Sequence, residues 1–205
     1  MFDDGGPLRP DSLLRLMGNT SLPTGWATLA LRPPKQVRYS LADFIDFGDD
    51  QDWWDKPATD KHYKMLSDLH RRDVERRVKD GGLHVGTVFR RCRYEEMRAE
   101  VRFDNLAGCL RTPRGGSARQ IVMVIDEGRV RFRWMSAREY ARLQGVPDFT
   151  LAENTIQSLF GFGDGVCVPV VRWVDEHILS PIYADECHSG NGASSKSKAS
   201  KNPRT

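Results

Sequence analysis

The chain has 205 residues, with 31 Lys or Arg, 28 Asp or Glu and a formal net charge of +3. This length can bury a real core, either as one domain with an extension or as two small domains. The mean hydropathy is −0.54, and no apolar run approaches the roughly 20 residues that a membrane helix needs. The first ten residues, MFDDGGPLRP, lack the basic and apolar regions of a secretory signal. We therefore expect a cytoplasmic protein that contacts no membrane.

The four cysteines, Cys92, Cys109, Cys167 and Cys187, are scattered without Cys-x-x-Cys spacing. This pattern argues against a zinc site and for a reducing compartment, so no metal is expected. Positive charge is concentrated in the middle of the chain, where residues 71–119 hold thirteen Arg or Lys against seven Asp or Glu. A polyphosphate such as DNA would be attracted to this region.

Residues 1–40 contain five prolines among short apolar runs, which predicts an irregular lead-in with one helix over residues 12–17. Residues 41–45 predict a short amphipathic turn, and Trp53 with Trp54 predicts a packing anchor. Apolar residues at helical spacing predict one helix over residues 60–80, capped by Asp60 and ended by Gly81 and Gly82. Its opposite face is basic and comprises Arg71, Arg72, Arg76, Arg77 and Lys79. This face indicates either a solvated surface or a contact with DNA phosphates.

The hydrophobic period changes after Gly82. Short strands are predicted over residues 85–89, 99–103 and 107–111, and a hairpin over residues 121–125 and 130–134 that turns at residues 126–128. A glycine-containing segment of residues 112–120 lies between the third strand and the hairpin. Its paired glycines allow the backbone to approach a phosphate or a base edge, and Arg and Gln can make bidentate contacts to guanine and adenine. A plain hairpin connection is the competing interpretation.

Ser136 and Glu139 form a predicted capping box, because the serine can accept from the N3 amide while the glutamate accepts from the N-cap amide. A helix should begin at Ala137. Gly145, which tolerates the left-handed conformation, and Pro147, which has no amide donor, should end it.

Residues 161–171, GFGDGVCVPVV, predict a glycine loop, followed by Pro169 in the first turn of another helix. The three glycines of the loop allow positive φ angles and close approach of the backbone to a neighbour or a ligand. That helix should pack an apolar side onto a partner element. Beyond Tyr183 the sequence is rich in Ser, Gly, Asn and Lys, which predicts a disordered tail. The expected apolar side comprises Val170, Val171, Val174 and Ile178.

Two of these segments resemble the ninth and tenth conserved motifs of the DNA (cytosine-5) methyltransferases. The ninth, roughly RxLTxRExARLQGFPD, resembles RWMSAREYARLQGVPD at residues 133–148, and the tenth, GNxVxVPV, resembles GDGVCVPV at residues 163–170. Asp164 stands where the family has asparagine. The motifs are long, occur in the right order and are plausibly spaced, and the resemblance covers roughly residues 12–181.

The resemblance implies roles for three sets of residues. The first implied set reads bases and holds the duplex around a flipped cytosine: Arg111, Thr112, Arg114, Gly115, Gly116, Ser117, Arg119 and Gln120. The second implied set lines part of an S-adenosylmethionine pocket: Gly163, Asp164, Gly165 and Val166. The third implied set has a structural role within the ninth motif: Ser136, Arg138, Glu139, Arg142, Gln144 and Gly145.

The implied fold class is α+β, a small β-rich target-recognition region followed by C-terminal helices that complete a class I, Rossmann-like α/β methyltransferase. The implied divisions are a lead-in of residues 1–40, target recognition by residues 41–134, a helical segment of residues 135–183, and a tail of residues 184–205. A complete family member also needs an S-adenosylmethionine glycine loop, a catalytic Pro-Cys, a Glu-Asn-Val and a Gln-x-Arg-x-Arg segment. None of these occurs in this sequence.

No catalytic residue is therefore expected here, and Cys92, which lies among arginines, is the one cysteine worth weighing as a nucleophile. The expected partners are double-stranded DNA and an N-terminal methyltransferase half. Glu153 and Asn154 are expected within a helix and are followed by threonine. Two other interpretations stay open at this point, a DNA-binding module without chemistry and a non-functional remnant of a truncated gene.

Overall fold

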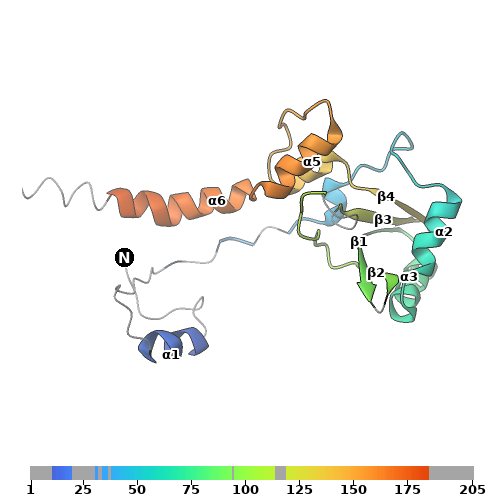
Figure 1. Ribbon diagram of the computed structural model, residues 1–205, viewed down its shortest axis with the longest axis horizontal. Coiled ribbons are helices and arrows are strands. Elements are labelled where there is room, and N and C mark those ends of the chain that lie inside the picture. Colours follow the sequence, from blue (N-terminus) through green and yellow to red (C-terminus); the bar gives the residue numbers. More distant parts are fainter. Residues whose placement is uncertain are drawn as a thin grey trace, which may run out of the picture. The chain divides into compact units, whose positions relative to one another are not determined.

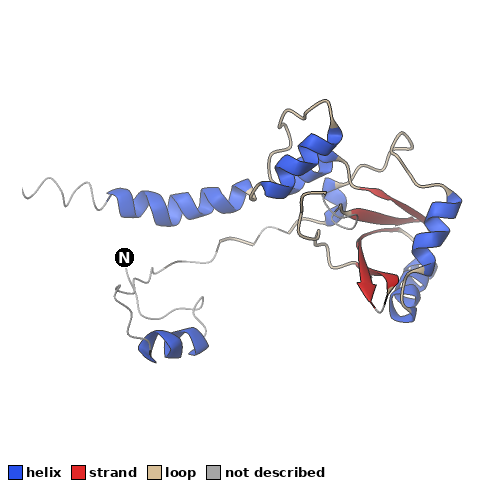
Figure 2. Ribbon diagram, viewed as in Figure 1, coloured by secondary structure: helices blue, strands red, loops and turns tan. Residues whose placement is uncertain are grey.

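A computed structural model describes residues 11–19, 31, 34–36, 38–93, 95–113 and 119–184. The chain divides into two compact units, one of residues 37–169 and one of residues 1–36 with 170–205. The unit of residues 37–169 contains the whole sheet and the helices from η1 to α5 (Figures 1 and 2).

The sheet has four antiparallel strands in the order β2-β1-β3-β4. β1 is Leu83–Arg93, β2 is Glu96–Arg102, β3 is Ile121–Asp126 and β4 is Arg129–Trp134. The predicted hairpin is confirmed: β3 and β4 pair up to Asp126 and Arg129. Its two loop residues, Glu127 and Gly128, have φ angles of 44° and 80°, as a two-residue type I′ turn requires.

The sheet is covered on both faces. Val85, Val122 and Val124 face a core that includes Tyr140 and Leu159, whereas the alternate residues of β3 face a second core. That second core is completed by Leu66 and Val74 before the sheet. Because side chains alternate along a strand, β3 contributes to both cores, and its residues 121–125 are at most 1% exposed. This burial on two faces explains why β3 reads as a continuous apolar run.

The predicted strand over residues 107–111 is wrong, because these residues lie in a loop. Both outer edges of the sheet already have partners. Leu66 forms a bridge to Ala99 on β2, and the Trp54 amide donates to the Phe132 carbonyl on β4 at 2.8 Å. The loop instead packs Ala107 and Leu110 against the core that includes Tyr140, and the Thr87 hydroxyl donates to the Leu106 carbonyl at 3.2 Å.

The predicted single helix over residues 60–80 is also wrong, since two helices occupy this region. α2 is Lys56–Lys64, with Asp55 as N-cap, and α3 is Asp68–Asp80, with Ser67 as N-cap. The helix breaks where Leu66 joins the edge of β2; Met65 still has helical backbone angles, and Ser67 is extended. The predicted end is confirmed, because Gly81 has a φ of 71°. The predicted turn near residue 41 is the 3₁₀ helix η1, Leu41–Phe44.

The basic face of α3 is largely neutralised within the helix. Arg71 pairs with Asp68 at 3.4 Å, and Asp73 pairs with Arg76 at 2.5 Å and with Arg77 at 3.5 Å. Such pairs at spacings of three and four residues stabilise an exposed helix and lower its net charge. This geometry favours the solvated surface over the phosphate contact.

Three helices follow the sheet: α4, Ala137–Leu143; α5, Thr155–Asp164; and α6, Val168–Val174. Asn154 is the N-cap of α5, and its side chain accepts from the Ile156 amide at 2.9 Å. The expectation that Asn154 lies inside a helix is therefore wrong. Pro169 is the second residue of α6, as predicted for a first turn.

In the other unit, α1 is Asp11–Asn19, which confirms the helix predicted over residues 12–17. α6 continues through the π-helical turn η2, Asp175–Leu179, and helical residues extend to Ala184. Val170 and Val171, on the predicted apolar side, are 59% and 46% exposed. No helix among the described residues is long and apolar enough to span a membrane. Most of the predicted lead-in and the tail beyond Ala184 lie outside the described residues.

Candidate functional site

The helix of the ninth motif, α4, begins as its sequence predicts. The Ser136 hydroxyl accepts from the Glu139 amide at 3.2 Å, and the Glu139 carboxylate accepts from the Ser136 amide at 2.7 Å. The helix ends at Gly145, whose φ is 75°. The capping box at its start and the left-handed glycine after its end therefore limit α4 to seven residues.

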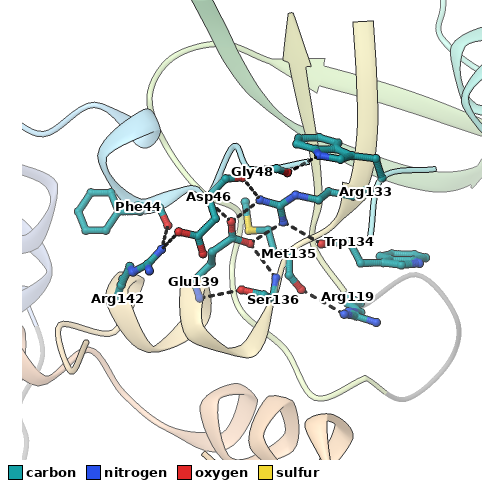
Figure 3. A network of polar contacts seen from close by, with 11 residues as sticks. Phe44, Asp46, Gly48, Arg119, Arg133, Trp134, Met135, Ser136, Glu139 and Arg142 are labelled. Atoms are coloured by element: carbon teal, nitrogen blue, oxygen red, sulfur yellow. Dashed lines mark hydrogen bonds and ion pairs between the residues drawn. The ribbon is translucent and has the colours of Figure 1, made fainter. Parts of the chain in front are cut away.

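A buried ion pair connects β4 to α4 (Figure 3). Arg133 donates from both terminal nitrogens to the two carboxylate oxygens of Glu139, at 2.5 and 2.8 Å. The two side chains are 1% and 0% exposed. Glu139 thus combines a helix cap with a bidentate pair, the arrangement in which a buried guanidinium is best satisfied.

The same network reaches the segment that follows η1. The Asp46 amide donates to Glu139 at 2.8 Å, and Arg133 donates to the Asp46 carbonyl at 2.6 Å. Arg142 donates to the Asp46 carboxylate at 2.8 Å and to the Phe44 carbonyl at 3.3 Å (Figure 3). Sequence reasoning did not find Asp46, because its partners lie more than 80 positions away and no local pattern marks it.

α4 also holds the residues that follow the glycine-containing segment. The Tyr140 hydroxyl accepts from the Gln120 amide at 2.9 Å, and the Gln120 side chain donates to the Cys109 carbonyl at 3.0 Å. Tyr140 is fully buried, and this burial raises the pKa of its hydroxyl above the ordinary value of 10.0. Gln120 is 6% exposed, so its side chain lies inside the protein.

Arg119 is likewise engaged within the chain. Its side chain donates to the Met135 carbonyl at 3.2 Å and lies 5.5 Å from the ring of Trp134. Arg90 lies 4.9 Å from the same ring. Burial lowers the pKa of Arg119. Of the two predicted base readers, Gln120 therefore connects the end of the segment to Cys109, and Arg119 attaches the same end to Met135.

The other predicted DNA-binding residues are placed differently. Arg111 is exposed and Thr112 is half-buried. The remaining four fall in residues 114–118, outside the described residues: Arg114, Gly115, Gly116 and Ser117. Cys92, the cysteine weighed as a nucleophile, is exposed on β1. Among the residues that the structure describes, no group of His, Cys, Asp or Glu is placed to hold a metal ion.

The predicted glycine loop of the tenth motif is wrong in conformation. Gly161 and Gly163 lie inside α5, and Gly165 is extended with a φ of −79°, so none of the three has a positive φ. The Asn154 cap and the apolar residues that follow it allow the helix to extend through two glycines. The close backbone approach is confirmed at Gly163. A methyl group there would lie 2.5 Å from the carbonyl carbon of Arg111 and closer still to the Thr112 amide nitrogen.

The ninth and tenth motifs contact each other directly. The Gln144 side chain donates to the Phe162 carbonyl at 3.0 Å, and the Gln144 carbonyl accepts from the Val168 amide at 3.0 Å. A side chain at Gly145 would collide with Pro169, whose Cγ would lie 2.5 Å away. Gln144 and Gly145 are therefore the residues at which the two motifs join.

Arg138, the remaining member of the structural motif, organises the turn after α4. It donates to the Pro147 carbonyl at 2.5 Å and to the Phe149 carbonyl at 2.9 Å. Between this turn and α5 lies a cavity of about 360 Å³ whose lining carries no ionisable group. Gly165 and Val166 of the predicted cofactor-facing set line it, with Gln144, Val146, Phe149 and Phe162 among the other residues. Asp164 and Gly163 are absent from that lining.

Comparison with known proteins places the chain in a family. No curated protein and no solved structure matches the chain. A family model described as C-5 cytosine-specific DNA methylase matches residues 38–180, a span that includes the sheet, the buried Arg133 and Glu139 pair, and the junction of the two motifs. The chain therefore belongs to the C-5 cytosine-specific DNA methylase family.

Proposed function

We propose that this chain supplies target-DNA recognition and the last two motifs of an S-adenosylmethionine-dependent DNA (cytosine-5) methyltransferase. In this proposal residues 41–134 recognise DNA, and residues 135–183 complete a Rossmann-like catalytic fold. The groups that perform the chemistry, the Pro-Cys nucleophile and the cofactor glycine loop, lie outside these 205 residues. The observation that carries the proposal is the junction of the two motifs at Gln144, because it brings the two family segments into direct contact.

The DNA side of the proposal rests on Arg111 and on the charge of the central region. Arg111 is exposed on a segment that Cys109 and Gln120 join to the sheet. A cation held on an ordered backbone can contact phosphate or a guanine edge without ordering a whole loop on binding. We assign Arg119 and Gln120 the task of supporting this segment, since both are engaged inside the protein.

The cofactor side of the proposal rests on the cavity beside α5. Its uncharged, mostly apolar lining suits an adenine ring, whereas the charged methionine end of S-adenosylmethionine needs ionic or hydrogen-bonding partners. Gly165 and Val166 would therefore form one wall of the cofactor pocket, and the other half of the enzyme would supply the rest. S-adenosylmethionine, when bound, supplies the methyl group that is transferred to cytosine.

Radiolabelled methyl transfer tests the proposal. The purified chain, duplex DNA and S-adenosylmethionine carrying a tritiated methyl group should give no labelled DNA. Affinity purification of the chain from its own cells should then recover a protein with the glycine loop and the Pro-Cys. Addition of that protein should start labelling of DNA. Labelled DNA with this chain as the only macromolecule would contradict the proposal.

A DNA-binding module without chemistry is the second candidate. The unit of residues 37–169 buries apolar residues on both faces of its sheet, which favours independent folding and argues against the non-functional remnant. Recovery of the chain alone, soluble and with salt-sensitive DNA binding, would support this module over the split enzyme.

A further inference from the structure

Helix α5 approaches the segment of residues 108–113 so closely that one position has no room for a side chain. A methyl group at Gly163 would lie 2.5 Å from the carbonyl carbon of Arg111 and 2.7 Å from Cα of Thr112. Real Cβ atoms essentially never come within 3.0 Å of another heavy atom. Both neighbouring atoms belong to the backbone, so no flexible side chain can move aside to admit the methyl group.

Two contacts of this segment lie on its sheet side. The side-chain nitrogen of Gln120 donates to the Cys109 carbonyl at 3.0 Å, and a methyl group at Gly108 would lie 2.5 Å from the side-chain oxygen of Gln120. These contacts fix the residues before Arg111. Gly163 contacts the segment from the α5 side, at Arg111 and Thr112 themselves. The position of the Arg111 backbone is therefore set between the sheet and one turn of α5.

We propose that Gly163 is a positioning residue for target recognition, because its missing side chain admits the backbone of Arg111 and Thr112 to the place from which Arg111 contacts DNA. The proposal rests on the DNA-recognition role proposed above. It changes the role of Gly163, which the resemblance assigns to the cofactor pocket. The end of α5 then serves two functions, since Gly163 seats the recognition segment and Gly165, which follows the helix, lines the neighbouring cavity.

The chain offers a matched control two residues away. Gly161 lies in the same helix, and a methyl group there would meet nothing within 4 Å. Gly161→Ala and Gly163→Ala therefore make the same chemical change in α5 and the same change in helix propensity. Only Gly163→Ala must displace the segment of residues 108–113. The distance between the new methyl group and the Arg111 carbonyl carbon has to increase from 2.5 Å to an ordinary 3.4 Å.

The first experiment measures hydrogen exchange of the full chain without DNA. Gly163→Ala should accelerate exchange in peptides covering residues 108–113 by at least about tenfold, and Gly161→Ala should leave those peptides unchanged. Peptides from β3 should exchange as in the wild type in both variants. Equal exchange of residues 108–113 in both variants would overturn the proposal, whatever the chain binds.

The second experiment measures binding to DNA. A duplex selected by the wild-type chain from a randomised pool is compared with a scrambled duplex of the same composition. Gly163→Ala should lower the ratio of the two affinities by about tenfold and leave the affinity for the scrambled duplex unchanged. A fall of both affinities in parallel would indicate a general loss of structure and would overturn the positioning role.

Two further results separate this inference from the proposed function. If the wild-type chain selects no duplex, the DNA-recognition function fails, and the exchange experiment still decides whether Gly163 seats the segment. If Gly163→Ala does not fold, the double variant Gly161→Ala, Gly163→Ala is measured in its place, because alanine at position 161 favours the helix. Failure of both variants to fold would overturn the proposal, since the contact would then support the whole unit.

Discussion

Removal of the Glu139 carboxylate should strongly destabilise the unit of residues 37–169. In Glu139→Ala the guanidinium of Arg133, which is 1% exposed, would remain buried without its anion. Breaking one side of a buried ion pair typically costs about 3–5 kcal/mol. The amides of Asp46 and Ser136 would lose their acceptor as well, at about 1 kcal/mol each. We therefore expect a loss of about 4 kcal/mol or more, a large part of the stability of a typical domain.

Urea unfolding followed by tryptophan fluorescence measures this loss, since Trp53 lies 4.9 Å from the Arg133 guanidinium. With a slope of about 2 kcal/mol per M, the midpoint should fall by about 2 M. The matched control is Asp60→Ala, which breaks a surface pair with Lys56 whose side chains are 47% and 83% exposed. This control should change the stability by less than about 1 kcal/mol.

A double variant separates the charge from the hydrogen bonds. Arg133→Met with Glu139→Leu removes both charges, so it should recover the part of the loss that comes from the unpaired guanidinium. It should not recover the part that comes from the two unpaired amides. A Glu139→Ala protein within about 1 kcal/mol of the wild type would refute this reasoning; water would then satisfy the Arg133 guanidinium.

Three more outcomes follow from single residues. Tyr140→Phe should cost about 1 kcal/mol of stability, because it removes the acceptor of the Gln120 backbone amide. Since burial raises the pKa of Tyr140, wild-type stability should hold below pH 10 and fall as the pH rises through the folded-state pKa. Urea titrations should show a smaller fall in Tyr140→Phe. Burial lowers the pKa of His62 below its ordinary 6.5. Wild-type stability should therefore be complete above pH 6.5 and fall as the pH drops through the folded-state pKa. His62→Phe, which keeps an aromatic ring beside Trp54, should lessen this dependence of stability on pH. Arg111→Ala should weaken DNA binding. If Arg111 contacts a phosphate, the variant should also reduce the slope of log affinity against log salt concentration by about 1. An unchanged affinity and an unchanged slope would show that Arg111 lies outside the interface.

The local elements could be predicted from the sequence because their determinants are local. The capping box of Ser136 and Glu139 joins residues three apart, and the left-handed Gly145 ends the helix within one turn. The β3–β4 hairpin follows from a continuous apolar run before Glu127 and Gly128 and an alternating run after them. In each case the hydrogen bonds that decide the structure connect near neighbours in the chain.

Several predictions failed where distant partners decide the structure. The helix over residues 60–80 breaks because Leu66 joins Ala99 at the edge of the sheet. Residues 107–111 form no strand, and distant segments contact the outer strands instead, through Leu66 on β2 and Trp54 on β4. The glycine loop is helical up to Asp164, since a glycine permits a positive φ without requiring it. Residue type alone could not distinguish these outcomes.

The sequence by itself determined the family motifs, the antiparallel hairpin and the bounded α4, because each depends on residue types at fixed short spacing. Only the tertiary structure decided which polar residues face the interior and which glycine has a neighbour. Gln120 and Arg119 turn inward because carbonyl groups of Cys109 and Met135 lie within reach. Gly163 and Gly161 are indistinguishable in a helix, and they differ only because the backbone of residues 111–112 lies against one of them. Burial and close approach are properties of pairs of distant segments, so they exist only once the chain has folded.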